Sequence, residues 1–139
     1  MKISLEKEKK IYFVSDLHLG APGKLNSLER EKKFIRWLNI IEINAQALFL
    51  LGDFFDFWFE YKEVVPKGFI RVLAKLADMR DKGISLFFFT GNHDLWIDNY
   101  LIDEIGMHIF YEKKEITINN YLFLIGHGDG LGPNDSIYK

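Results

Sequence analysis

The sequence predicts an α/β domain built on a largely parallel sheet with flanking helices. Short apolar runs that are typical of buried strands alternate with longer segments in which apolar residues recur at helical spacing. Several of the apolar runs stop abruptly at a glycine or at an acidic residue, as strands do where a loop begins. The chain has 139 residues, 48% of them hydrophobic, which suits one domain with a packed core.

The first expected strand covers residues 11–15. A helix is expected next, with Asn26 as its N-cap, Glu29 as the capping-box partner and an end near Ile43. The apolar residues of this helix recur at the spacing of one buried face: Phe34, Trp37, Leu38 and Ile41.

The second expected strand covers residues 47–51 and leads into an aromatic and then polar loop over residues 54–65. Pro66 suits the first turn of a second helix, and Gly83 suits its C-terminal stop. One apolar face is expected between them, made by Phe69, Val72 or Leu73, Leu76 and Met79.

The third expected strand covers residues 86–90, and a short helix over residues 97–104 is closed by Gly106. Two final strands flank Asn119-Asn120, a pair that accepts the left-handed conformations of a tight hairpin turn. No later element follows to cover these strands, so we expect an exposed sheet face or edge there.

The composition excludes several classes of protein. The net charge of −2 gives no broad basic surface, so nucleic acid is not an expected partner. The absence of cysteine excludes disulfides and thiolate metal sites, so any metal must bind oxygen and imidazole nitrogen. No apolar run approaches the ~20 residues of a membrane-spanning helix, and the charged N-terminus lacks a signal-peptide core, so we expect a cytoplasmic location.

Side chains that can bind a metal ion or transfer a proton follow four of the expected strands. Strand ends of an open α/β sheet meet at one edge, where ligands bind. Each motif alone is also explained as an ordinary polar turn. Together they predict a dinuclear metal site with Asp53 between the two ions. The four motifs are Asp16-Leu17-His18, Gly52-Asp53, Gly91-Asn92-His93-Asp94 and Gly126-His127-Gly128-Asp129.

This order of motifs resembles the calcineurin-like metallophosphoesterase superfamily, whose pattern is Asp-x-His, Gly-Asp, Gly-Asn-His-Asp/Glu, His and then Gly-His-x-His. The first four motifs match, and the fifth does not occur in the sequence. The resemblance therefore implies that residues 1–139 form one metallophosphoesterase domain that is truncated at its C-terminal side. It also implies an incomplete form of a four-layer α/β/β/α sandwich.

The resemblance further assigns the metal ligands. It implies that Asp16 and His18 bind one divalent ion, that Asp53 bridges, and that Asn92 and His127 bind the other. Oxygen and imidazole ligands of this kind suit Mn²⁺, with Mg²⁺, Fe or Zn²⁺ as alternatives.

The resemblance also implies two catalytic residues. His93 would stabilise the phosphoryl transition state or protonate the leaving oxygen, and Asp94 would hold the His93 ring. His108 lies outside every motif and is interpreted as a surface or packing histidine.

Four longer stretches are similar to the UDP-2,3-diacylglucosamine hydrolases of lipid A synthesis, in the form found in Bacteroidetes-type bacteria. They cover residues 53–61, 64–68, 91–96 and 126–133. This resemblance implies hydrolysis of a UDP-linked glycolipid to UMP and 2,3-diacylglucosamine 1-phosphate, with peripheral contact at the inner membrane. The better-known branch of that family has Arg where this chain has His93, so the reaction class is better supported than the substrate.

Two alternative functions remain open from the sequence. One is a general nucleotide or phosphoester phosphodiesterase on the same scaffold, and the other is a non-catalytic scaffold that has lost its metals. Because the fifth motif is absent, we expect the 139-residue chain alone to show little or no activity.

The substrate-binding residues are not identified by the sequence. The aromatic cluster over residues 54–61 is interpreted either as core packing under the second helix or as a wall for uracil or an acyl chain. Lys67 and Arg71 are candidates for a phosphate contact, although such residues are more often simply solvated.

Overall fold

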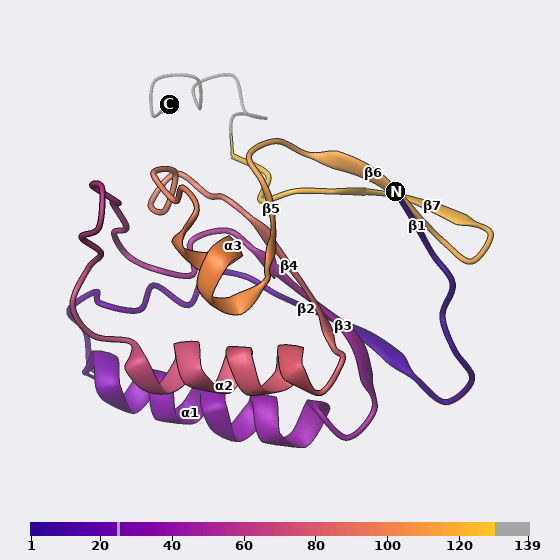
Figure 1. Ribbon diagram of the computed structural model, residues 1–139, viewed down its shortest axis with the longest axis horizontal. Coiled ribbons are helices and arrows are strands. Elements are labelled where there is room, and N and C mark those ends of the chain that lie inside the picture. The colour runs from indigo at the N-terminus through magenta and orange to yellow at the C-terminus, as the bar shows by residue number, and fades with distance from the viewer. Residues whose placement is uncertain (25, 130–139) are drawn as a thin grey trace.

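The computed structural model describes residues 1–24 and 26–129, and its architecture is shown in Figure 1. One sheet has four parallel strands in the order β2-β3-β4-β5. These strands are β2 (Lys10–Val14), β3 (Ala45–Leu51), β4 (Ser85–Phe89) and β5 (His108–Phe110). Three helices connect them: α1 (Ser27–Ile41), α2 (Ile70–Asp81) and α3 (Tyr100–Ile105). The predicted α/β class with a largely parallel sheet is therefore confirmed.

A second sheet has three strands in the order β1-β6-β7. Its strands are β1 (Lys2–Ile3), β6 (Lys114–Ile118) and β7 (Tyr121–Ile125). β1 runs parallel to β6, and β6 and β7 form the predicted antiparallel hairpin, with Ile118 paired to Tyr121. Asn119 takes a φ of 54° in the two-residue turn, as expected for Asn there.

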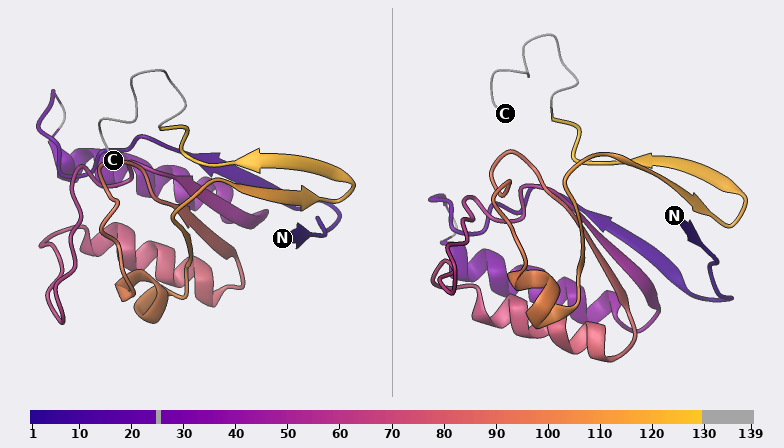
Figure 2. Two further views of the ribbon diagram at one scale, coloured as in Figure 1. Left: turned by 90° about the horizontal axis from the view of Figure 1, so that it is seen from above. Right: turned by 45° about the horizontal axis from the view of Figure 1, so that its top comes forward.

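The helices lie on one face of the four-stranded sheet and the second sheet lies on the other (Figure 2). The core on the helical face is built around Leu38, Leu48, Leu76 and Phe88, all of which are fully buried. The core between the sheets is smaller and pairs Phe49 with Ile116 and Ile125. Alternating residues of β3 thus face opposite cores, as the side-chain period of a strand requires.

Helix α1 begins as expected, because the Asn26 side chain accepts a hydrogen bond of 2.9 Å from the backbone N–H of Glu29. The expected start of the second helix at Pro66 is wrong. α2 begins at Ile70 because Gly68 and Phe69, with φ of 105° and 59°, keep the preceding chain out of the helical conformation. α2 ends at Asp81, two residues before Gly83, as predicted.

The N-terminus of α2 is capped from another helix. Glu31 on α1 is buried, and its Oε1 accepts hydrogen bonds of 3.0 Å from the backbone N–H groups of both Arg71 and Val72. Phe69 at the N-cap position supplies no side-chain bond of its own. A carboxylate on α1 therefore satisfies the first turn of α2 and ties the two helices together.

Two short strands were not predicted. β1 has only two residues, and β5 has three, the first of which is His108. Neither strand is long enough to show the two-residue period of side chains that predicts a strand. β1 is formed by pairing with β6, and β5 is formed by pairing with β4. His108 is exposed and its ring stacks on Phe87 at 5.2 Å, which agrees with a surface or packing role.

The expected short helix near residues 97–104 begins later, at Tyr100, and ends at Ile105 with Gly106 as its C-cap. Within the described residues, no helix combines the length and the apolar character needed to cross a membrane.

Candidate metal centre

The first two motifs are joined through their backbones at the carboxyl ends of β2 and β3, which lie toward the left of Figure 1. The N–H of Asp16 donates to the carbonyl oxygen of Gly52 at 3.2 Å, and the N–H of His18 donates to that of Asp53 at 2.9 Å. Asp16, His18 and Asp53 all have positive φ, of 57°, 43° and 52°. Non-glycine residues rarely adopt this conformation, and such strain is concentrated at functional sites.

Asp53 lies at the centre of the candidate site. It is buried, and its Oδ2 lies 3.6 Å from Nε2 of His18 and 3.4 Å from Nε2 of His127. Its Oδ1 accepts a hydrogen bond of 3.1 Å from the backbone N–H of His93. One carboxylate thus faces imidazole nitrogens from two different loops, which is the arrangement that a shared ligand requires.

His127 follows β7, an edge strand of the second sheet, so the expectation that all four motifs follow strands of one sheet is wrong for His127. Its Nδ1 lies 2.7 Å from the carbonyl oxygen of Leu51. Because a carbonyl only accepts, Nδ1 carries the proton, and the unprotonated Nε2 is left to face Asp53. This tautomer suits a metal ligand.

The glycines of two motifs allow these groups to approach closely. A Cβ at Gly91 would lie 2.2 Å from Oδ1 of Asp53 and 2.6 Å from its backbone nitrogen. A Cβ at Gly52 would lie 2.6 Å from Cγ of His127. Either contact is shorter than real Cβ atoms show, so side chains at these two positions would displace the central groups.

Asn92 lies in the loop after β4, between Gly91 and His93, and is half-buried. Among the described residues, no hydrogen-bond partner is found for its side-chain amide. Asn92 directly precedes His93, whose backbone N–H donates to Oδ1 of Asp53.

Asp56 is a site residue that the sequence motifs did not predict. Its backbone carbonyl accepts a hydrogen bond of 2.8 Å from Nδ1 of His93, and its Oδ1 lies 3.3 Å from Nδ1 of His18. The rings of His18 and His93 meet edge to face at 4.8 Å. The signal that could have identified Asp56 is its position three residues after Asp53, on the loop that the Gly-Asp motif begins.

Contrary to the expectation from the sequence, Asp94 does not hold the ring of His93. Its carboxylate is fully buried and accepts hydrogen bonds from backbone N–H groups of Gly91, Phe54 and Phe55, at 2.7, 2.8 and 3.3 Å. Asp94 therefore ties the loop after β4 to the loop after β3, and Asp56 is the acidic residue beside His93. Burial raises the pKa of the Asp94 carboxyl despite the three donors.

The pKa of His93 is raised. The largest cause is the hydrogen bond to the Asp56 carbonyl, and the carboxylates of Asp53, Asp56 and Asp94 act in the same direction. The bond fixes the proton on Nδ1, so Nε2 is the ring atom available to a ligand.

The side chains present fit divalent cations. Asp16, His18 and Asp53 offer ligand atoms that all lie within 4.8 Å of one another, and so do His18, Asp56 and His93. Among the described residues, the buried carboxylate of Asp53 faces two imidazoles and forms no ion pair with a lysine or arginine, so a bound cation would balance its charge. The chain thus carries a set of candidate His and Asp ligands for a metal.

In the aromatic cluster over residues 54–61, some side chains pack in the core and others are exposed, so each of the two interpretations, core packing and a wall for a ligand, fits part of the cluster. Phe54, Phe55 and Trp58 are buried in the helical-side core, while Phe57, Phe59 and Tyr61 are 47–59% exposed. Lys67 and Arg71 are exposed and make no ion pair among the described residues, which agrees with solvated side chains. The part of the fourth stretch from residue 130 to 133 lies outside the described residues.

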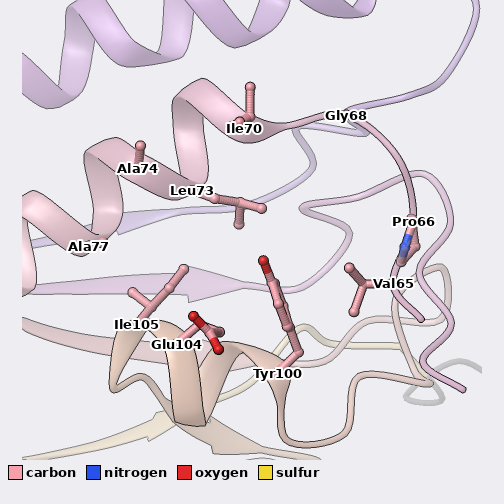
Figure 3. Close-up of a pocket in the computed structure, with 10 residues that line it drawn as sticks. All are labelled: Val65, Pro66, Gly68, Ile70, Leu73, Ala74, Ala77, Tyr100, Glu104 and Ile105. Carbon is pink, nitrogen blue, oxygen red and sulfur yellow. The ribbon is translucent and has the colours of Figure 1, made fainter. Parts of the chain in front are cut away.

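A groove of about 320 Å³ lies between α2 and α3, and Figure 3 shows the side chains that surround it. Its walls are mainly apolar, with Leu73 and Ala77 on α2 facing Tyr100 and Ile105 on α3. The residues that line the groove include none of the candidate metal ligands, so the groove is separate from the candidate metal centre.

The fold and the candidate metal centre agree with a comparison against known families, in which residues 9–138 match the calcineurin-like phosphoesterase family. The chain belongs to this family.

Within this family, the chain is similar to curated proteins that share one name. The chain is 42% identical over 120 residues to the UDP-2,3-diacylglucosamine hydrolase of Porphyromonas gingivalis, an alignment that covers 86% of this chain and 46% of the relative. It is 34% identical over 127 residues to the protein of the same name from Proteus mirabilis, covering 91% and 51%. It is 32% identical over 132 residues to that of Neisseria meningitidis serogroup A, covering 94% and 53%. The chain therefore spans about half the length of the curated relatives it matches.

Proposed function

We propose that this chain belongs to a metal-dependent hydrolase that cleaves the pyrophosphate of UDP-2,3-diacylglucosamine to give UMP and 2,3-diacylglucosamine 1-phosphate. The observation that carries the proposal is the position of Asp53, whose buried Oδ2 lies within 3.6 Å of imidazole nitrogens from two separate loops. The names of the relatives support the choice of substrate. The proposed setting is the cytoplasmic side of the inner membrane, because the substrate carries acyl chains.

The proposed ligands are the five residues that the motifs supply. Asp16 and His18 would hold one ion, Asn92 and His127 the other, and Asp53 would contact both. When bound, two divalent cations, with Mn²⁺ as the preferred metal, supply Lewis-acid stabilisation of the phosphoryl oxygens and make water a stronger acid.

The protein's own residues would orient the reacting groups. The backbone of Leu51 fixes the tautomer of His127, and the Asp56 carbonyl fixes that of His93. His93 would then hold a proton on Nδ1 and use Nε2 to contact a phosphoryl or leaving oxygen. Asp94 would act indirectly, because it fixes the two loops that carry Asp53 and His93.

The test is release of UMP from UDP-2,3-diacylglucosamine by the full gene product, measured with and without Mn²⁺. Chelation should abolish the release, and Asp53→Asn should lower both metal content and turnover. A panel of cyclic nucleotides and p-nitrophenyl phosphates tests the general phosphodiesterase alternative. Turnover of that panel without UMP release would end the lipid assignment, and metal content unchanged by Asp53→Asn would end the metal-site assignment.

A further inference from the structure

Asp56 contacts two histidines of the candidate metal centre with two different oxygens. Its carboxylate Oδ1 lies 3.3 Å from Nδ1 of His18, and its backbone carbonyl oxygen accepts a hydrogen bond of 2.8 Å from Nδ1 of His93. The side chains of His18 and Asp56 are 31% and 33% exposed, so water competes only in part for their contact. One residue thus faces the Nδ1 atoms of both rings.

The backbone fixes the position of Asp56 relative to His18. Leu19 and Phe55, the residues that adjoin His18 and Asp56, form an isolated parallel β-bridge and are fully buried. The N–H of Asp56 donates to the carbonyl oxygen of Leu19 at 2.9 Å, and the N–H of Leu19 donates to that of Phe54 at 2.9 Å. Because the two segments are paired in this way, the Asp56 carboxylate is held beside His18 by a rigid support.

The opposite nitrogen of the His18 ring faces two candidate metal ligands. Nε2 lies 3.6 Å from Oδ2 of Asp53 and 4.0 Å from Oδ1 of Asp16. An imidazole binds a metal through an unprotonated nitrogen, so a ligand role for His18 beside these carboxylates requires the proton of the neutral ring to be on Nδ1. An ionised carboxylate only accepts, so Asp56 favours an N–H at the nitrogen that it faces.

We propose that Asp56 is a positioning residue of the metal centre, whose carboxylate holds the proton of His18 on Nδ1 and so leaves Nε2 to bind a divalent cation. This inference rests on the proposed function, in which His18 is a metal ligand. A histidine that binds a metal commonly donates its second ring N–H to a carboxylate or a carbonyl, which fixes both the tautomer and the orientation of the ring. The geometry assigns that task to Asp56.

The other two histidines of the centre are held by main-chain oxygens. Nδ1 of His127 donates to the carbonyl oxygen of Leu51 at 2.7 Å, and Nδ1 of His93 donates to that of Asp56. A substitution at position 56 leaves both of these acceptors in place, whereas the contact to His18 is made by the side chain that the substitution changes. Replacing the Asp56 carboxylate therefore tests the tautomer of His18 separately from those of the other two rings.

The experiment records the ring nitrogens of His18 in the full gene product by long-range proton–nitrogen NMR at alkaline pH, without metal or substrate. The signal is assigned by its absence in His18→Gln. Wild type should show the Nδ1–H tautomer, and Asp56→Ala should lose this preference and bind Mn²⁺ about 10–100-fold more weakly. Asp56→Asn keeps a side-chain oxygen that accepts, so it should retain more of the tautomer and of the affinity. The matched control is Glu63→Ala, an exposed carboxylate on the same loop, which should change neither.

Three results would overturn the proposal: an Nε2–H tautomer of His18 in wild type, an unchanged tautomer in Asp56→Ala, or an equal loss of Mn²⁺ affinity in Glu63→Ala. The first is read in wild type, so it decides the question even where Asp56→Ala does not fold. Weaker Mn²⁺ binding with an unchanged tautomer would make Asp56 a ligand and not a positioning residue. Wild type that binds Mn²⁺ without releasing UMP would end the proposed substrate and leave this inference standing, whereas UMP release with an unchanged tautomer in Asp56→Ala would do the reverse.

Discussion

Nε2 of His127 lies 3.4 Å from Oδ2 of Asp53, although the two residues follow strands of different sheets. The opposite ring nitrogen of His127 is bonded to the Leu51 carbonyl, on the strand that ends just before Asp53. The second sheet is thus attached to the first at the point where the candidate metal centre is formed. The hairpin that supplies His127 is therefore part of the site.

His127→Ala should weaken the binding of Mn²⁺ by at least roughly tenfold, because a ligand is removed and Asp53 loses its neighbour. Isothermal titration calorimetry of the chain with Mn²⁺ would measure this change. The control is His108→Ala, which removes an exposed histidine on β5 outside the cluster and should leave the affinity unchanged. Equal affinities for wild type and His127→Ala would remove His127 from the ligand set.

Gly91→Ala should lower the free energy of unfolding by about 1–3 kcal/mol and also weaken metal binding. The new Cβ would lie 2.2 Å from the Asp53 carboxylate, so Asp53 must move. Urea denaturation and metal titration would measure the two effects. Gly83→Ala is the matched control, since its Cβ meets no atom within 4 Å and only its φ of +89° is unfavourable. It should lower stability and leave metal affinity intact, so a parallel loss of affinity in Gly83→Ala would contradict the steric explanation.

His93→Ala should lower turnover by the full gene product roughly 10²–10⁴-fold while leaving its metal content unchanged, as expected for a group that transfers or donates a proton. Asp56→Asn keeps the backbone carbonyl that bonds Nδ1 of His93, so it should lower turnover less. Steady-state kinetics together with metal analysis would separate these cases. Loss of metal in His93→Ala would instead identify His93 as a ligand.

Glu31→Gln should destabilise the protein by about 1–3 kcal/mol, because the buried carboxylate that accepts from two N–H groups at the start of α2 becomes a neutral amide. Urea denaturation followed by circular dichroism would measure the change. Glu29→Gln is the control, since its side chain is exposed and its ion pair among the described residues is with Lys32 on the surface of α1. Similar stabilities for the two variants would show that the cap is unimportant.

The pKa of Glu42 is lowered by hydrogen bonds from Lys75 and then Lys82. A carboxyl whose pKa is lower in the folded state stabilises that state above its unfolded pKa, near 4.5, and loses this contribution as the pH falls through the folded value. Glu42→Gln should therefore lower the melting temperature by about 1–3 °C at pH 7, and by less at pH 3.

Differential scanning calorimetry at the two pH values would measure this dependence. Glu112→Gln, at an exposed position with no ion pair among the described residues, should show no such change with pH. A melting difference for Glu42→Gln that is independent of pH would exclude the ion pairs as its cause.

The alternation of strand-like and helical segments was enough to predict the α/β class, the cap at Asn26 and the hairpin at Asn119-Asn120. These features depend on neighbouring residues, so a local pattern carries them. β1 and β5 were missed because such short strands are formed by their partners and not by their own sequences. The start of α2 was misplaced because Pro66 is compatible with a helix, whereas the left-handed backbone at Phe69 is set by its surroundings.

By itself, the sequence determined which side chains follow the strands and that they include carboxylates, imidazoles and an amide. Only the tertiary structure decided that His127 arrives from a second sheet, that Asp94 ties two loops together, and that Asp56 is the residue beside His93. The physical reason is that residue types near a strand end are encoded locally. The partner of each side chain, by contrast, depends on which loops the packing of the sheets and helices brings within hydrogen-bond distance.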